Sequence, residues 1–104
     1  MEVRFFDKKV KQFVWDIDMP TSAKVFRMFE LLERVGHTLG MPHSKHIGRG
    51  LFELRVRGIQ EVRLMYVFHK NAAIILHGFF KKSQRIPNKE IDLARQKLST
   101  LDRI

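Results

Sequence analysis

The sequence predicts an α+β fold: an antiparallel sheet of about four strands packed against two N-terminal helices, with a further helix at the C-terminus. Residues 51–57 and 61–69 alternate apolar and polar side chains, as half-buried strands do. Residues 19–35 and the stretch after Pro87 repeat apolar residues at helical spacing. A chain of 104 residues can bury one core, so we expect a single domain over residues 1–104.

The N-terminal part is predicted to form a short strand and two helices. Residues 1–6 alternate as a strand does, with Val3 and Phe5 on one side. The second helix has Asp18 as an N-cap, a proline directly after its first residue, and Gly36 as its stop. Apolar residues at helical spacing mark the two helices: Val10, Phe13, Val14 and Ile17, then Val25, Met28, Phe29, Leu32 and Val35.

A long loop and a hairpin follow. Residues 37–50, HTLGMPHSKHIGRG, predict a loop, and long ordered loops often carry function. In the hairpin, a two-residue turn would mix apolar and polar faces, whereas the three-residue loop 58–60 keeps them apart. Arg55 then lies opposite Arg63. Because like charges directly across an antiparallel pair repel, we expect an anion over them.

The C-terminal part is predicted to contain the last strand and a helix. Residues 73–80 form the strand, and Gly78 leaves room there for another group to approach. Tyr66 on the preceding strand alternates with core residues, so we expect its ring to pack and its hydroxyl to lie at an edge. Pro87 opens the helix, whose apolar stripe is Ile91, Ala94, Leu98 and Leu101.

The charge of the chain indicates an anionic partner. Twenty Lys and Arg against 11 Asp and Glu give a net charge of +9, which favours nucleic acid, an anionic membrane surface or an acidic protein. No apolar run approaches the roughly 20 residues of a membrane-spanning helix. The start lacks the apolar segment of a secretory signal and cysteine is absent, so we expect a cytoplasmic protein without membrane insertion.

Metal and cofactor motifs are not evident in the sequence. His43 and His46 lie three residues apart in the loop, but no set of converging ligands accompanies them. The GRG at 48–50 fits neither nucleotide-binding fingerprint, and the serines lack a supporting triad signature. We therefore expect neither a metal site nor a bound cofactor.

Cationic side chains gather on one face of the predicted sheet and in the loop that enters it. They suit a phosphodiester, because guanidinium groups hold phosphate oxygens in pairs and lysines neutralise the backbone. The alternative is a solvated basic face without a ligand. RNA cleavage would also need a base and an acid, for which Lys81, Lys82, His46 and His77 are candidates. The cationic set is Arg55, Arg63, Lys81, Lys82, Lys45, His46 and Arg49.

Three motifs carry a resemblance to a known family. The run GMPHSKHIGRGLFELRVRG, then VRLMY, then ILHGFFKKSQRIPNKEIDLA resembles the phage-derived, HigB-like branch of the RelE and ParE toxin superfamily. It covers roughly residues 20–98. The resemblance implies a RelE-like fold and the toxin of a type II toxin–antitoxin system. Such a toxin is a metal-independent endoribonuclease, or mRNA interferase, that cuts messenger RNA on the ribosome and so inhibits translation.

The resemblance also implies site residues and partners. Arg55, Arg63, Lys81 and Lys82 match positions that contact phosphate and act in catalysis. The partner would be an antitoxin with a helix-turn-helix domain, so that operator DNA is contacted only indirectly. Lys45 matches a basic position and is assigned RNA contact only. Together with residues of the basic face, the expected RNA-binding set is Lys45, His46, Arg49, Arg57 and Gln84.

Two alternative functions stay open from the sequence. The superfamily also contains gyrase poisons, so a ParE-like gyrase inhibitor is one alternative. A non-catalytic basic module that binds RNA or an acidic protein is the other, because a fold does not fix a function.

Overall fold

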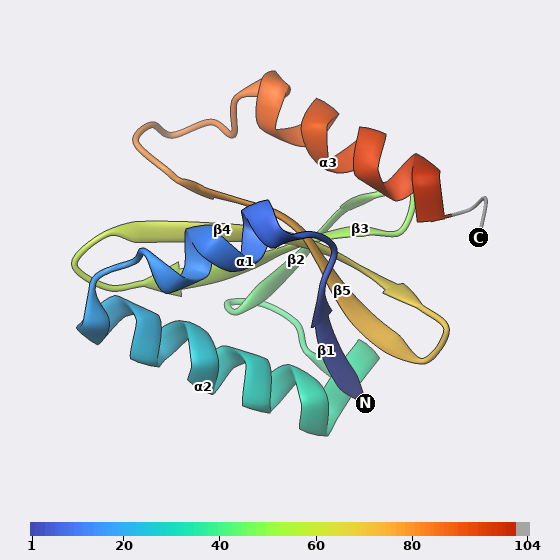
Figure 1. Ribbon diagram of the computed structural model, residues 1–104, viewed down its shortest axis with the longest axis horizontal. Helices are drawn as coiled ribbons and strands as arrows, with labels where there is room; N and C mark the ends of the chain where they lie inside the picture. The colour runs from blue at the N-terminus through green and yellow to red at the C-terminus, as the bar shows by residue number, and fades with distance from the viewer. Residues whose placement is uncertain (102–104) are drawn as a thin grey trace.

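The computed structural model describes residues 1–101 and has a five-stranded sheet between two layers of helices (Figure 1). Helices α1 and α2 cover one face of the sheet, and α3 covers the other. The predicted α+β class is confirmed. The elements are β1 (Glu2–Phe5), α1 (Lys8–Trp15), α2 (Met19–Val35), the 3-10 helix η1 (Gly36–Thr38), β2 (Ser44–Gly48), β3 (Leu51–Arg57), β4 (Glu61–His69), β5 (Ala72–Phe80) and α3 (Asn88–Leu101).

The sheet differs from the prediction in strand number and direction. Its order is β1-β5-β4-β3-β2, and β1 runs parallel to β5 whereas the other pairs are antiparallel. The expectation of about four antiparallel strands is therefore wrong at both edges. The additional strand, β2, lies inside the predicted loop 37–50 and pairs with β3, with an irregularity between His46 and Gly48. That pairing gives the segment backbone partners that its own composition does not indicate.

The two faces of the sheet carry separate apolar clusters. On one face, side chains of α1 and α2 such as Val14 and Leu32 pack against Leu54 of β3. On the other face, Ala94 of α3 packs in a cluster with Met65 of β4. The predicted packing of two N-terminal helices on the sheet is confirmed, and α3 occupies the opposite face, a position that the sequence did not predict.

Local signals for helix ends and for the hairpin are confirmed. The Asp18 side chain accepts a hydrogen bond from the Thr21 amide at 2.9 Å, as an N-cap does. Gly36 ends α2 with a positive φ of 52°. The hairpin has the predicted three-residue loop, and Arg55 lies opposite Arg63.

Gly78 and Tyr66 of neighbouring strands both face the helices α1 and α2. A Cβ on Gly78 would collide with the ring of Phe13 from α1, so the approaching group is this ring. The Tyr66 ring is fully buried, as predicted for packing. Its hydroxyl does not lie at an exposed edge, because it shares a hydrogen bond with Ser44 Oγ inside the core.

Within residues 1–101, no helix is both long and apolar enough to cross a membrane.

Candidate functional site

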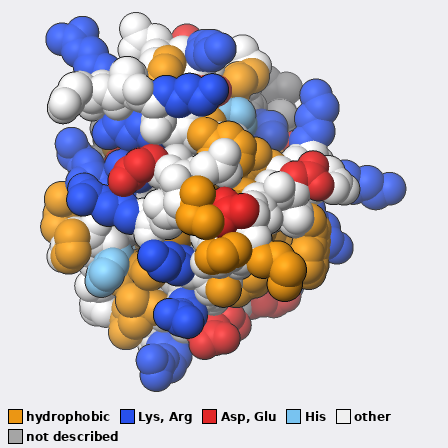
Figure 2. All heavy atoms as spheres, turned by 90° about the vertical axis from the view of Figure 1, so that its left-hand side faces the viewer, with side chains coloured by type: hydrophobic (Ala, Val, Ile, Leu, Met, Phe, Trp, Pro, Cys, Tyr) orange, Lys and Arg blue, Asp and Glu red, His pale blue; other side chains and the backbone are white. Residues whose placement is uncertain are grey.

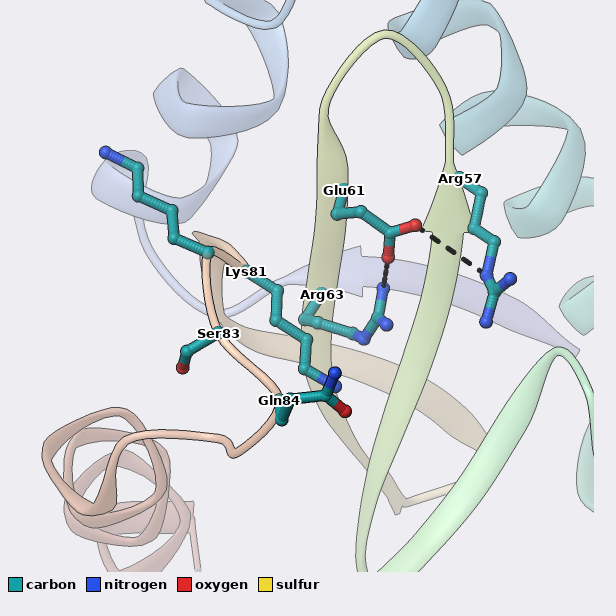
Figure 3. Close-up of a pocket in the computed structure, with 7 residues that line it drawn as sticks. Arg57, Glu61, Arg63, Lys81, Ser83 and Gln84 are labelled. Carbon is teal, nitrogen blue, oxygen red and sulfur yellow. Dashed lines mark ion pairs between the residues drawn. The ribbon is translucent and has the colours of Figure 1, made fainter.

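A cationic pocket of about 430 Å³ lies beside the β3–β4 hairpin, where β3 and β5 end and β4 begins. Strand pairing continues past β5, since the Lys81 amide donates to the Glu61 carbonyl at 2.8 Å. The chain then turns, with Ser83 Oγ donating to the Arg85 carbonyl at 2.9 Å. This turn brings the residues after β5 alongside β4 (Figure 3). The lining residues are Arg57, Glu61, Arg63, Lys81, Lys82, Ser83 and Gln84.

Glu61 lies between the two arginines of this pocket. Its Oε2 is 2.9 Å from Arg63 Nη1, and its Oε1 is 3.7 Å from Arg57 Nε (Figure 3). The Lys81 side chain extends along the other side of the pocket toward Gln84. The residues that line the pocket therefore include four basic side chains and a single carboxylate. Such an excess of positive charge attracts a phosphate group.

Arg63 is buried, although it lines the pocket. Its side chain is only 3% exposed, and beside it Glu53 is completely buried. Glu53 Oε1 accepts from Arg55 Nε at 2.9 Å and lies 3.8 Å from Arg63 Nε. The anion expected over the opposed arginines is thus a carboxylate of the protein itself. Because this internal charge compensates the pair, their opposition does not by itself require an external ligand.

The structure brings together most of the predicted site residues. Arg63, Lys81 and Lys82 of the predicted catalytic set line the cationic pocket, as do Arg57 and Gln84 of the predicted RNA-binding set.

Arg55 does not line the cationic pocket, although it lies opposite Arg63 and shares Glu53 with it. It lines a second pocket of about 490 Å³ on the other side of β3, which also contains Arg57. The residues lining the second pocket are Lys24, Arg27, Met28, Pro42, His43, Arg55, Val56 and Arg57.

The remaining predicted RNA-binding residues lie outside both pockets. Lys45 and His46 are exposed on β2, and Arg49 is exposed in the turn between β2 and β3 with a positive φ of 51°. None of the three lines either pocket. They form a separate basic edge of the sheet.

Glu61 and Glu53 are site residues that the sequence reasoning missed. Each precedes an arginine by two positions, at Arg63 and Arg55, so that each acid and its arginine share one face of their strand. This spacing is visible in the sequence and could have indicated internal ion pairs on the basic face.

His77, a candidate for proton transfer, lies elsewhere. Its Nε2 is 3.0 Å from Glu90 Oε1 of α3, and its side chain is 17% exposed. It therefore ties β5 to α3 and does not line the cationic pocket.

Among residues 1–101, no three His, Asp or Glu side chains lie close enough together to hold a metal ion.

The face at the hairpin end of the molecule carries many Lys and Arg side chains, from its top down its left side (Figure 2). Both pockets include Arg57, the last residue of β3, so they lie at this end of the molecule.

The chain matches a known family over residues 12–99, which is well over half of its length; the family is described as Phage derived protein Gp49-like (DUF891). The chain belongs to this family. The Gp49-like proteins are a RelE/HigB-like toxin family, so the resemblance is confirmed at that level. The match begins upstream of residue 20, where the resemblance seen in the motifs starts. No curated protein shows significant similarity to the chain.

Proposed function

We propose that this Gp49-like protein is the toxin of a type II toxin–antitoxin pair and cuts messenger RNA on the ribosome. The observation that carries the proposal is the cationic pocket, to which β3, β4 and the segment directly after β5 contribute Arg57, Arg63 and Lys81. Membership of a RelE/HigB-like toxin family supports the same conclusion independently.

The pocket suits the phosphate of an RNA backbone. Arg57 has a side chain that is 76% exposed, and Lys82 is exposed as well, so both can reach a phosphate without unfolding any element. Lys81 is less exposed than these two side chains and extends along the other side of Arg63 toward Gln84 (Figure 3). Charge-assisted hydrogen bonds from such groups are the strongest that proteins offer to phosphate oxygens.

The proposed reaction is attack of the ribose 2′-oxygen on the adjacent phosphorus. The 2′-hydroxyl loses its proton to a base, the bond from phosphorus to the 5′-oxygen breaks, and that oxygen takes up a proton. Lys81 and Lys82 would stabilise the negative charge that develops on phosphate, as fixed cations do in other phosphoryl transfers. Arg63 would hold Glu61 in position through their 2.9 Å ion pair.

Glu61, Lys81 and Lys82 are the side chains of the cationic pocket that can exchange protons. We propose that the base and the acid come from these three. All belong to the chain itself, so the proposed reaction uses no metal and no cofactor. The proposed partners are ribosome-bound messenger RNA and a helix-turn-helix antitoxin, through which operator DNA is contacted indirectly, and the proposed site of action is the cytoplasm.

The test is primer extension on a defined message in a purified translation system, with and without ribosomes. We expect cuts within codons only when ribosomes are present, and a ribosome-free control with excess EDTA should stay uncut. Lys81→Ala should remove the cuts. A matched control is Arg34→Ala, because Arg34 is exposed at the far end of α2, where the Glu33 carbonyl accepts from the N-terminal amine.

Two outcomes would contradict the proposal. A message that stays intact at high protein concentration would refute the nuclease, and inhibition of DNA supercoiling would then indicate a gyrase inhibitor. Cuts that persist in Lys81→Ala would show that the cationic pocket is not the catalytic site.

A further inference from the structure

The second pocket is lined by both basic and apolar side chains. It lies between the N-terminal half of α2, the segment before β2, and the end of β3. No acidic residue lines it. Its basic lining residues are Lys24, Arg27, Arg55 and Arg57, together with His43, and its apolar lining residues are Met28, Pro42 and Val56.

Hydrogen bonds hold the walls of the second pocket together. Lys24 Nζ donates to the Arg57 carbonyl at 3.0 Å, which joins α2 to the end of β3. The Arg55 amide donates to the His43 carbonyl at 2.8 Å, which joins β3 to the segment before β2. The pocket is therefore built from elements that are already in place, and a ligand need not order them.

The two pockets meet at Arg57, which lines both. Its guanidinium is largely exposed and is held only at 3.7 Å by Glu61. Arg55 also reaches the second pocket, with its Nε fixed by Glu53 and its side chain 20% exposed. A polyanion lying across the end of β3 would thus meet cations on both sides.

We propose that the second pocket binds the nucleotide of single-stranded RNA that lies next to the two nucleotides flanking the phosphate in the cationic pocket. The base would lie on Met28, Pro42 and Val56, and the phosphate would be held by Arg27 and Arg57. The basic side chains of the two pockets would contact successive phosphates of a single strand, and the apolar side chains of the second pocket would contact a base between them. This inference rests on the proposed function, since it extends the same RNA beyond the cationic pocket.

An acidic protein segment is the competing ligand, and it fits less well. The cations of the second pocket continue across Arg57 into the cationic pocket, so an extended, regularly charged chain matches both pockets at once. Single-stranded RNA carries one charge for every nucleotide, whereas a peptide would need acidic residues at matching spacing.

The test compares the binding of oligoribonucleotides of two and six nucleotides. Both carry 2′-O-methyl groups, which block the attacking 2′-oxygen, so that neither can be cleaved. Affinities are measured by fluorescence anisotropy at several salt concentrations. We expect Arg27→Ala to weaken the hexanucleotide by roughly fivefold to tenfold and to leave the dinucleotide unchanged, because one charge-assisted phosphate contact is lost. The salt slope for the hexanucleotide should fall by about 0.7, the value for one phosphate on a single strand. Lys81→Ala should weaken both lengths, and Arg34→Ala neither.

Several outcomes would overturn the inference. They are equal weakening of both lengths by Arg27→Ala, no effect of that substitution, or no binding of the hexanucleotide at low salt. An octapeptide of glutamate that binds more tightly than RNA and depends on Arg27 would identify a protein-docking surface instead. Because these RNAs cannot be cut, a length-dependent effect would stand even if primer extension found no cleavage, and the two proposals can fail separately.

Discussion

Replacement of Glu53 by glutamine should destabilise the protein strongly, because its carboxylate is the internal counterion of two arginines. Glu53 is completely buried, and it lies 2.9 Å from Arg55 and 3.8 Å from Arg63. Removing one partner of a buried ion pair costs about 3–5 kcal/mol, since the other charge stays buried. Arg63 keeps Glu61 at 2.9 Å, so we expect the lower end of this range, about 3 kcal/mol.

In a chain of this length, such a loss should lower Tm by about 12–24 °C, at ~4–8 °C for each kcal/mol. Thermal unfolding followed by circular dichroism, with urea unfolding at 25 °C, measures the effect. Glu2→Gln is the matched control: its ion pair with Arg4 is more than half exposed, and we expect Tm to stay the same.

A double-mutant cycle tests whether charge burial is the cause. Glu53→Gln combined with Arg63→Gln removes both buried charges, so we expect the pair to cost clearly less than the sum of the single substitutions. A loss below about 1 kcal/mol for Glu53→Gln, as for a surface pair, would refute the reasoning. Simple additivity in the double variant would refute it as well.

The core supplies two further predictions. Tyr66→Phe leaves the buried Ser44 hydroxyl without its partner and should cost about 1 kcal/mol in urea unfolding. Burial raises the pKa of the Tyr66 phenol above its ordinary 10.0 despite the Ser44 hydrogen bond. The stability that the neutral phenol contributes is therefore present below pH 10 and is lost as pH rises through the pKa of the folded state. An equal loss of stability at alkaline pH in Tyr66→Phe would contradict this. Gly78→Ala should cost about 1–3 kcal/mol, because its Cβ would overlap the Phe13 ring. Gly40→Ala, with open space around it, should change little, and equal effects would argue against overlap as the cause.

The alternation of apolar and polar residues predicted the central strands β3 and β4 well. Alternation along β3 and β4 fixes which side chains share a face, and a shift of one residue would bury charges, so the register of the hairpin could be predicted. The ends of α2 were also predictable, because the Asp18 cap and Gly36 act within one turn of the helix.

The edges of the sheet depend on partners distant in the chain. β2 is short, and its alternation is obscured by histidine and glycine, so only pairing with β3 defines it as a strand. β1 and β5 are parallel although about 70 positions separate paired residues such as Glu2 and Ala72. Nothing in either segment alone indicates this partner, since strands of either kind present the same alternation.

The sequence indicated which basic residues lie together at the candidate site, but not how their side chains are arranged. Lys81 and Lys82 follow a core strand, which places them at the end of the sheet near Arg63. The burial of Arg63 and its sharing of Glu53 depend on side-chain geometry across strands, which the spacing of the arginines does not reveal.

The most direct test of the proposed function separates cleavage from binding in Lys81→Ala. Single-turnover cleavage of a message on purified ribosomes gives the rate, and anisotropy with an uncleavable oligoribonucleotide gives the affinity. We predict that the rate falls by about 100- to 1,000-fold, the usual effect of removing one group that stabilises the transition state. The affinity should fall by less than about tenfold, since one phosphate contact is lost. Equal and small losses of rate and affinity in Lys81→Ala would contradict catalysis in the cationic pocket and would support a basic surface that only binds.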